Sequence, residues 1–320
     1  MVNMDTCLVA GGAGFIGTHL CKRLLEKNLK VICVDNFISS SRENIDKLSK
    51  NPNFSFIEHD VIKPLPEDLK VDYVFHLASP ASPNHHSKIS YHALPLETML
   101  VNTTGTFELL KFTQKNNAKF LFTSTSEIYG DPLEHPQNEE YRGNVSTLGP
   151  RSVYDESKRF GETITAYFVR SHDVDARIAR IFNTYGPLMM KEDRRMIVDF
   201  INQAIEGKPI TVFGDGNQTR SLCFVEDLVE GLILLMFHPD TKGEVVNLGS
   251  EDEHSVLEYA NLIKKLTNSD SEITLSESLP VDDPHKRKPD IAKAKRLLDW
   301  SPKVNLEDGV LQTIEYFKSL

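Results

Sequence analysis

The chain has 320 residues, 40% of them hydrophobic, and its 36 basic and 46 acidic side chains leave a formal net charge of −10. This composition excludes a mainly disordered chain, and the acidic balance argues against nucleic acid or an anionic membrane as a partner. The apolar runs fall well short of the about 20 residues of a membrane-spanning helix. No signal peptide pattern precedes the first predicted strand, and the four cysteines show no CxxC spacing, so we expect a cytoplasmic protein with reduced thiols.

Short apolar runs alternate with segments of helical periodicity through the first half of the chain. Strands are predicted at 6–10, 31–34, 54–58, 72–77, 119–123 and 176–182. Helices are predicted at 15–27, 95–117 and 152–171. Continuous apolar strands joined through helices are typical of a parallel sheet that is covered on both faces. We therefore predict an α/β fold with a Rossmann-type doubly wound parallel sheet.

Turn clusters and shorter elements replace this alternation in the second half of the chain. A strand at 245–248 is expected to return to the main sheet, and helices at 255–266 and 291–298 to form a smaller lobe. We expect an NAD-binding Rossmann domain of residues 1–183 and about 222–250. The remaining segments, 184–221 and 251–320, are expected to form an interleaved, mostly C-terminal α/β lobe that binds the substrate.

A glycine-rich turn follows the first predicted strand. Gly11, Gly14 and Gly17 form a G-x-x-G-x-x-G pattern that opens the first helix, and Asp35 ends the second strand. Glycines there let backbone N–H groups approach a pyrophosphate at the helix N-terminus. A carboxylate at the end of the second strand accepts hydrogen bonds from ribose hydroxyls and repels a 2′-phosphate. The sequence therefore predicts a dinucleotide site that prefers NAD to NADP.

A tyrosine and a lysine stand one helical turn apart in the predicted helix 152–171. An ammonium group at Lys158 near the phenol of Tyr154 favours the phenolate and makes the tyrosine a usable base. Such a pair arises often by chance, and a structural tyrosine is the alternative. Here Thr125 and its polar neighbours end a strand of the same predicted sheet, at the edge where ligands of α/β proteins bind.

Together these features resemble the extended short-chain dehydrogenase/reductase superfamily, and within it the UDP-glucuronate decarboxylases, or UDP-xylose synthases. The resemblance extends over nearly the whole chain. It rests on HLASPASP at 76–83, STSEIYGDP at 124–132, ARIFNTYGP at 179–187, QTR at 218–220, NLG at 247–249 and DDPHKRKPD at 282–290.

The resemblance implies a decarboxylase whose NAD is tightly bound and recycled. Tyr154, assisted by Lys158 and Thr125, would take the proton of the C4 hydroxyl while hydride passes to NAD. The ketone at C4 places the carboxylate β to a carbonyl, so that CO₂ leaves and the same cofactor re-reduces C4. Glu127 and Arg287 would lie beside the C5 end of the sugar, where the arginine pairs with the carboxylate.

The resemblance also assigns binding roles. The substrate would be held by Ser126, Asn183, Arg220, Asn247 and Arg287. The cofactor would contact Gly11, Gly14, Phe15, Ile16, Gly17, Asp35, Asn36, Asp60, Val61, Leu77, Ala78, Ser79, Tyr154, Lys158 and Arg195. Taken alone, several of these have plain structural explanations, such as a turn at Asp60, a strand-end cap at Asn183 and a solvated charge at Arg220.

The sequence departs from the decarboxylase pattern in the substrate half of the site. Residues 84–94 form a longer segment than is usual, Leu100 stands where a lysine is frequent, and Leu188 and Met190 replace an arginine and a histidine. A 4,6-dehydratase or a 4-epimerase of the same superfamily is therefore the alternative, acting on a hexose nucleotide. A catalytically silent NAD sensor is a hypothesis of another class, which the retained Tyr154 argues against.

The remaining expectations concern metals and self-association. His85 and His86 invite a metal interpretation, but no second pair of ligands stands at suitable spacing, so no metal is expected. The resemblance implies a homodimer through a four-helix bundle, with 94–117 and 153–171 as the candidate helices.

Overall fold

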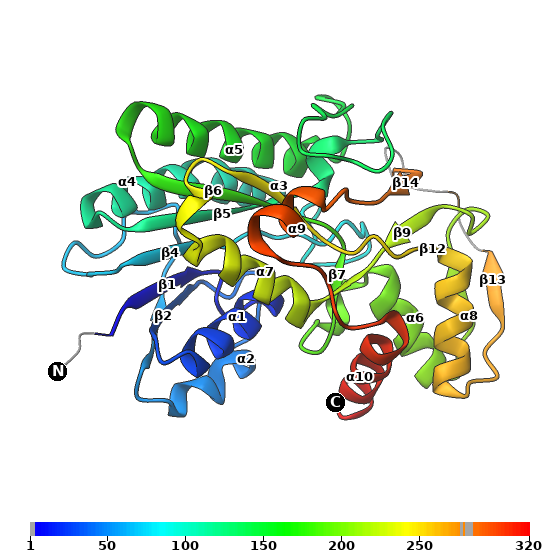
Figure 1. Cartoon of the computed structure of the whole chain (residues 1–320). Helices are drawn as coiled ribbons and strands as arrows, with labels where there is room; N and C mark the ends of the chain where they lie inside the picture. Colours follow the sequence, from blue (N-terminus) through cyan, green and yellow to red (C-terminus); the bar gives the residue numbers. More distant parts are fainter. Residues whose placement is uncertain (1–3, 276–277, 279–283) are drawn as a thin grey trace.

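The computed structural model describes residues 4–275, 278 and 284–320. Within them, a seven-stranded sheet in the order β11-β6-β5-β4-β1-β2-β3 forms the centre of the molecule (Figure 1). All its strand pairs are parallel. The strands are β1 (Thr6–Ala10), β2 (Lys30–Asp35), β3 (Phe54–Glu58), β4 (Tyr73–His76), β5 (Lys119–Thr125), β6 (Asp175–Ile181) and β11 (Val245–Leu248). The predicted Rossmann-type sheet and the returning strand at 245–248 are confirmed.

Helices cover both faces of this sheet (Figure 1). The helices are α1 (Phe15–Glu26), α2 (Glu43–Asp46), α3 (Pro95–Leu100), α4 (Thr106–Asn116), α5 (Ser152–His172), α6 (Met196–Ile205), α7 (Val225–Phe237), α8 (Val256–Thr267), α9 (Ala292–Leu298) and α10 (Leu306–Lys318). No helix in the described part of the chain is both long enough and apolar enough to cross a membrane.

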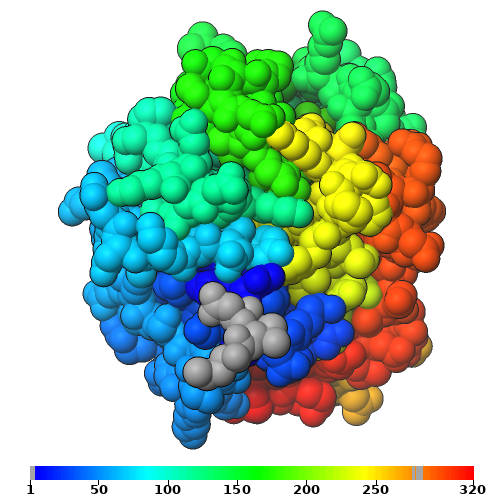
Figure 2. Space-filling model, turned by 60° about the vertical axis from the view of Figure 1, so that its left-hand side comes forward, coloured from blue at the N-terminus to red at the C-terminus, as the bar shows by residue number. Residues whose placement is uncertain are grey.

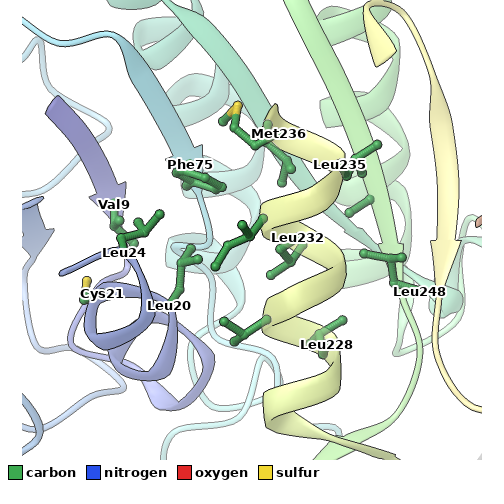
Figure 3. Close-up of a cluster of buried hydrophobic side chains, with 14 of the residues drawn as sticks. Val9, Leu20, Cys21, Leu24, Phe75, Leu228, Leu232, Leu235, Met236 and Leu248 are labelled. Carbon is green, nitrogen blue, oxygen red and sulfur yellow. The ribbon is translucent and has the colours of Figure 1, made fainter. Parts of the chain in front are cut away.

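The two faces are built from alternate residues of the strands, which point to opposite sides of a sheet. In β1, Cys7 and Val9 join a core cluster with α1 and α7, whereas Leu8 and Ala10 join a second cluster with α4 and α5. Figure 3 shows α1 and α7 lying over the first face, with their leucines turned toward the strands. Full burial of each such leucine stabilises the fold by about 1.5–3 kcal/mol.

The predicted helix over 95–117 is interrupted. Between α3 and α4 the backbone makes a π-helical turn at Val101–Gly105. This turn aims Asn102 at two hydroxyls, and its side-chain N–H groups donate to Ser79 and Ser157 at 3.1 Å each. A π-turn inside a helix is frequent near functional sites, because the extra residue re-aims a side chain.

A smaller part of the molecule packs around a separate core. Ile201 of α6, Ile263 of α8 and Ile314 of α10 meet there with Val212. Short strands flank these helices: β7 (Thr184–Tyr185) with β10 (Cys223–Phe224), β8 (Ile210–Val212) with β13 (Ile273–Leu275), and β9 (Thr219–Ser221) between β12 (Glu253–Ser255) and β14 (Lys286–Arg287).

The stretch from the end of α9 to Trp300 packs on the main sheet and not in that smaller core. Leu298 and Trp300 belong to the core cluster of the main sheet, and the Trp300 indole N–H donates to the backbone oxygen of Asp227 in α7 at 3.0 Å. Figure 2 shows the blue N-terminal segments beside the yellow and orange later segments on one face of the molecule. The predicted division into two interleaved lobes stays a prediction.

Candidate active site

A cavity of about 620 Å³ lies at the C-terminal edge of the main sheet. Its wall includes the residue that directly follows each of five strands: Gly11, Asn36, Leu77, Ser126 and Phe182. The carboxyl ends of parallel strands form the ligand-binding edge of open α/β sheets. The fold therefore places the cavity where the sequence predicts the site.

The glycine-rich turn is shaped by close backbone contacts. Gly11 has φ +79°, and a Cβ there would lie 2.6 Å from the backbone nitrogen of Ala78. A Cβ on Gly17 would lie 2.0 Å from the Gly11 oxygen. Among the described residues, a Cβ on Gly14 would meet that same oxygen alone, at 3.3 Å, and Gly14 lines the cavity at the N-terminus of α1. That cradle fits a pyrophosphate held by backbone N–H groups.

Asp35 closes the other side of this cradle. Its carboxylate accepts hydrogen bonds from the backbone N–H of Ala13 at 3.0 Å, the backbone N–H of Phe37 at 2.9 Å and the Ser40 hydroxyl at 2.8 Å. These donors fix the carboxylate at the cavity wall, and its remaining acceptor capacity suits ribose hydroxyls. The site therefore fits the NAD that the sequence predicts.

Tyr154 and Lys158 lie together on the wall of the cavity. The Lys158 Nζ donates to the backbone oxygen of Thr123 at 2.8 Å and lies 5.8 Å from the centre of the Tyr154 ring. Burial lowers the pKa of Lys158 to about 7. Burial and the nearby charge of Glu127 raise the pKa of Tyr154, which a hydrogen bond with Thr125 partly offsets. Tyr154 is therefore a neutral phenol at neutral pH, and the lysine beside it loses its proton more readily than an exposed lysine.

Glu127 forms ion pairs with two buried arginines that line the cavity. Its carboxylate accepts hydrogen bonds from the guanidinium groups of Arg151 and Arg287. The Arg287 Nη2 lies 2.9 Å from the Glu127 Oε2. Although burial acts to raise the pKa of Glu127, the two guanidinium charges hold it below its usual value. The carboxylate is ionised at neutral pH, beside cations that can also bind a carboxylate of a substrate.

The predicted site residues meet at this cavity with one exception. Its wall contains Gly11, Gly14, Phe15, Ile16, Gly17, Asp35, Asn36, Asp60, Val61, Leu77, Ala78, Ser79, Thr125, Ser126, Glu127, Tyr154, Lys158, Asn183, Arg195, Arg220 and Arg287. This clustering of residues from the whole chain supports one composite site. Residues 282–283 of the predicted 282–290 block lie outside the described residues.

Asn247 does not line the cavity, in contrast to its predicted contact with the nucleotide. It is fully buried, and its side chain accepts from the Tyr129 hydroxyl at 2.8 Å and donates to the backbone oxygens of Gln137 and Asp290 at 3.0 and 3.2 Å. The protein itself thus occupies its hydrogen-bonding groups. In this structure Asn247 joins the loop after β5 to the segment before α9.

The departures from the decarboxylase pattern differ in their distance from the site. Leu100 lines the cavity, whereas Leu188 and Met190 do not. Leu188 instead occupies a turn with φ +70°. Of these three residues, Leu100 is therefore the one that forms part of the cavity wall.

Arg151 is a site residue that the sequence analysis did not single out. It stands three residues before Tyr154, on the turn that leads into α5, and is buried against Glu127. Its spacing of one helical turn from the predicted base is the signal that could have identified it. In the part of the chain that the structure describes, no group of three His, Cys, Asp or Glu residues could hold a metal.

Comparisons with known proteins agree with this geometry. The model of the NAD dependent epimerase/dehydratase family matches residues 7–249. UDP-glucuronic acid decarboxylase 2 of Arabidopsis thaliana is 48% identical over 314 residues, which span 97% of this chain and 68% of the relative. UDP-glucuronic acid decarboxylase 1 of Xenopus tropicalis is 46% identical over 312 residues, 97% of this chain and 72% of the relative.

A solved structure of the same fold carries a sugar nucleotide and NAD. UDP-glucuronic acid 4-epimerase from Bacillus cereus, in complex with UDP-glucuronic acid and NAD, superposes with a TM-score of 0.87. Its sequence is 30% identical, and the match covers 98% of this chain and 99% of that chain.

Proposed function

This chain belongs to the NAD dependent epimerase/dehydratase family, and from that membership we propose that it decarboxylates UDP-glucuronate to UDP-xylose. The enzyme is a nucleotide-sugar decarboxylase that uses NAD and regenerates it in each turnover. The relatives that are 46–48% identical over 97% of this chain support this choice of reaction.

The observation that carries the proposal is the buried contact of Arg287 with Glu127, on the same cavity as Tyr154 and Lys158. Oxidation at C4 needs only the base and its partners. A guanidinium group nearby adds a binding partner for a sugar carboxylate. The combination fits a substrate that is oxidised at C4 and carries a carboxylate at C5.

Tyr154 begins the reaction by taking the proton of the C4 hydroxyl. The Lys158 ammonium stabilises the phenolate that has to form, and the Thr125 hydroxyl, which bonds to Tyr154, orients it. NAD held at the glycine turn and Asp35 would supply the hydride acceptor for C4 and the later hydride donor, and its positive ring would favour the phenolate.

Arg287, which is bonded to Glu127, acts at the C5 end of the sugar. Arg287 pairs with the substrate carboxylate. Once C4 is a ketone, the C5–carboxylate bond breaks, CO₂ leaves, and the electron pair of this bond forms an enolate with its oxygen on C4. Donors at Tyr154 and Thr125 stabilise the enolate oxygen. C5 then takes a proton from solvent. Return of the hydride to C4, with the proton of Tyr154 going back to the C4 oxygen, completes UDP-xylose with no net oxidation.

A second candidate reaction uses the same substrate. The Bacillus cereus structure is a UDP-glucuronic acid 4-epimerase, at 30% identity. Epimerisation would proceed through the same C4 ketone but keep the carboxylate. The two reactions therefore differ only in the fate of that ketone, which the product reports.

The test is to incubate the purified protein with UDP-glucuronate and follow CO₂ and the mass of the sugar nucleotide. We expect UDP-xylose with no net NADH, and its loss in Tyr154→Phe and Arg287→Ala. The exposed neighbour Lys286 supplies the matched control, because Lys286→Ala removes a cation that faces solvent. Formation of UDP-galacturonate without CO₂ would establish the epimerase instead.

We also propose a cytoplasmic homodimer. The four cysteines are free and buried, which agrees with a reducing compartment. The helices predicted to dimerise expose apolar side chains, namely Leu96 and Met99 of α3, Phe107 of α4, and Phe160 and Tyr167 of α5. A second copy of this surface would bury them in a four-helix bundle.

A further inference from the structure

Tyr91 lies behind the proposed catalytic tyrosine. Its ring stacks on the ring of Tyr154, with centroids 4.9 Å apart and planes within 9°. Tyr91 is fully buried and does not line the cavity, so it contacts the phenol from the protein side. The guanidinium of Arg151 lies 6.0 Å from the centre of the Tyr91 ring. The Tyr91 ring therefore stacks on Tyr154 and lies near the arginine that pairs with Glu127.

The segment that carries Tyr91 is anchored to the rest of the molecule. It is the longer 84–94 segment in which the sequence departs from the decarboxylase pattern, and the Tyr91 backbone N–H donates to the Ser82 oxygen at 3.2 Å. Three side chains in or next to this segment donate hydrogen bonds to backbone oxygens of the loop before α6. Ser82 donates to Asp193 at 2.6 Å, Asn84 to Arg194 at 2.5 Å and Ser87 to Glu192 at 2.5 Å. These hydrogen bonds hold the backbone that carries the Tyr91 ring in place.

The hydroxyl of Tyr91 contributes less than its ring. It is buried and has no hydrogen-bond partner among the residues that the structure describes. Nothing in the fold thus depends on a hydrogen bond from this group, whereas the stacked ring fills the space beside Tyr154. Phenylalanine would preserve that contact, and an aliphatic side chain would not.

We propose that Tyr91 is a positioning residue, whose ring holds the Tyr154 phenol in the orientation from which it takes the C4 proton. This inference rests on the role given to Tyr154 in the proposed function. A base displaced by about 1 Å can lose about 100-fold in rate, so the loss of a rigid support acts mainly on kcat.

The first test compares Tyr91→Leu with Tyr91→Phe in the decarboxylation assay. We expect Tyr91→Leu to lower kcat by about 10- to 100-fold with little change in KM, because substrate binding is untouched and only the base is misplaced. Tyr91→Phe should restore kcat to near the wild-type value. The amount of bound NAD and cooperative urea unfolding show that each variant is folded, and Tyr91→Met replaces Tyr91→Leu if the latter fails to fold.

Two results would overturn the inference. If Tyr91→Leu keeps the wild-type kcat, the ring does not position Tyr154. If Tyr91→Phe loses as much activity as Tyr91→Leu, the hydroxyl matters and the stacking does not.

A second measurement, the pKa of Tyr154, tests the contact between Tyr91 and Tyr154 without substrate. The ionisation of Tyr154 is followed by phenolate absorbance, with a Tyr154→Phe version of each variant as the blank. Burial is the main cause of the raised pKa of Tyr154, so the opening left by Tyr91→Leu should lower this pKa, and Tyr91→Phe should leave it raised. The charged or titratable neighbours are the same in both variants: Glu127, Asp155, Lys158 and Arg195.

This titration separates the two proposals. If the wild-type protein releases no CO₂ from UDP-glucuronate, the proposed function fails, and the titration alone decides the role of Tyr91. An unchanged pKa in Tyr91→Leu would then reject the positioning role.

Discussion

At the scale of single residues, the site uses burial to prepare an acid–base pair. Lys158 is buried, and its pKa is lowered from about 10.5 to about 7 by that burial alone. Burying a charged lysine away from water destabilises the fold. In the proposed function the protein keeps this lysine because its ammonium group assists Tyr154. Residue-level function and stability therefore oppose each other at this position.

Replacement of Lys158 by methionine should expose this conflict. The unfolded chain keeps the Lys158 proton up to about pH 10.5, and the folded protein releases it near pH 7. Between these values the unfolded state binds more protons, so this residue makes the wild-type more stable as the pH rises. We expect Lys158→Met to lose catalysis yet be at least as stable as the wild-type at or below pH 7.

Urea unfolding at several pH values measures this effect. The advantage of Lys158→Met should shrink by about 1.4 kcal/mol for each pH unit between pH 7 and 10.5. Parallel stability curves for the two proteins would show that Lys158 does not titrate in this range in the folded state. The exposed Lys286→Ala variant serves as the control and should follow the wild-type curve.

The individual site residues could be predicted only where they belong to a local motif. Gly11, Asp35 and Tyr154 stand in short patterns whose spacing carries the chemistry. The contact of Arg287 with Glu127 joins residues 160 positions apart, and only the family resemblance placed them together. Arg151 lies 24 positions from Glu127, and no periodicity links the two. Long-range pairs of charges depend on the folded arrangement and leave no local signal.

At the scale of elements, we expect two glycines in the turn from β1 into α1 to have different roles, one in folding and one in cofactor binding. A Cβ at Gly17 would collide with the Gly11 oxygen at 2.0 Å, whereas one at Gly14 would lie 3.3 Å from that oxygen, which a small local shift relieves. Gly14 also has φ −75°, which alanine adopts without strain. The two glycines therefore serve different purposes in one motif.

Alanine substitutions at these positions should give contrasting results. Gly14→Ala should leave the free energy of unfolding of the NAD-free protein within about 0.5 kcal/mol and weaken NAD binding at least about tenfold, because its methyl group occupies the cradle. Gly17→Ala should destabilise the fold itself by about 1–3 kcal/mol through overpacking. Calorimetric titration with NAD and urea unfolding measure both effects. Unchanged NAD affinity in Gly14→Ala would remove the pyrophosphate from this cradle.

The elements of the main sheet were predictable because each strand is a short apolar run beside an amphipathic helix. Helix α7 was not singled out, since it is buried on several sides, from Leu228 to Met236, and shows no polar stripe. The π-turn at Val101–Gly105 also escaped prediction. Its cause is tertiary, because Asn102 bonds to Ser79 and Ser157 from other parts of the chain.

At the scale of the whole molecule, the main sheet and the smaller core contribute opposite walls to one cavity. The sheet edge supplies the glycine turn, Thr125 and Tyr154, and the later segments supply Arg220 and Arg287. The segment around Trp300 packs in the core of the main sheet, while α8 before it and α10 after it pack in the smaller core, so the chain connects the two cores repeatedly. The interleaved division into two lobes stays a prediction drawn from the turn clusters.

The proposed dimer is a property of the whole molecule that can be tested separately from catalysis. We expect a mass of about twice 36.2 kDa by light scattering, and a monomer for Phe107→Glu combined with Phe160→Glu, because the charges would face the partner's apolar helices. Leu275→Glu, on an exposed apolar residue of β13 far from these helices in sequence, is the control and should stay dimeric. A monomeric wild-type protein at micromolar concentration would contradict the proposal.

The most direct test of the central claim follows the hydrogen at C4. UDP-glucuronate that carries deuterium at C4 is converted by the purified enzyme, and the UDP-xylose is examined by mass and proton NMR. We predict that the deuterium is retained at C4, because the hydride that leaves this carbon is returned to it by the same bound cofactor. Loss of the deuterium from C4 during formation of UDP-xylose would contradict decarboxylation through a C4 ketone with hydride return.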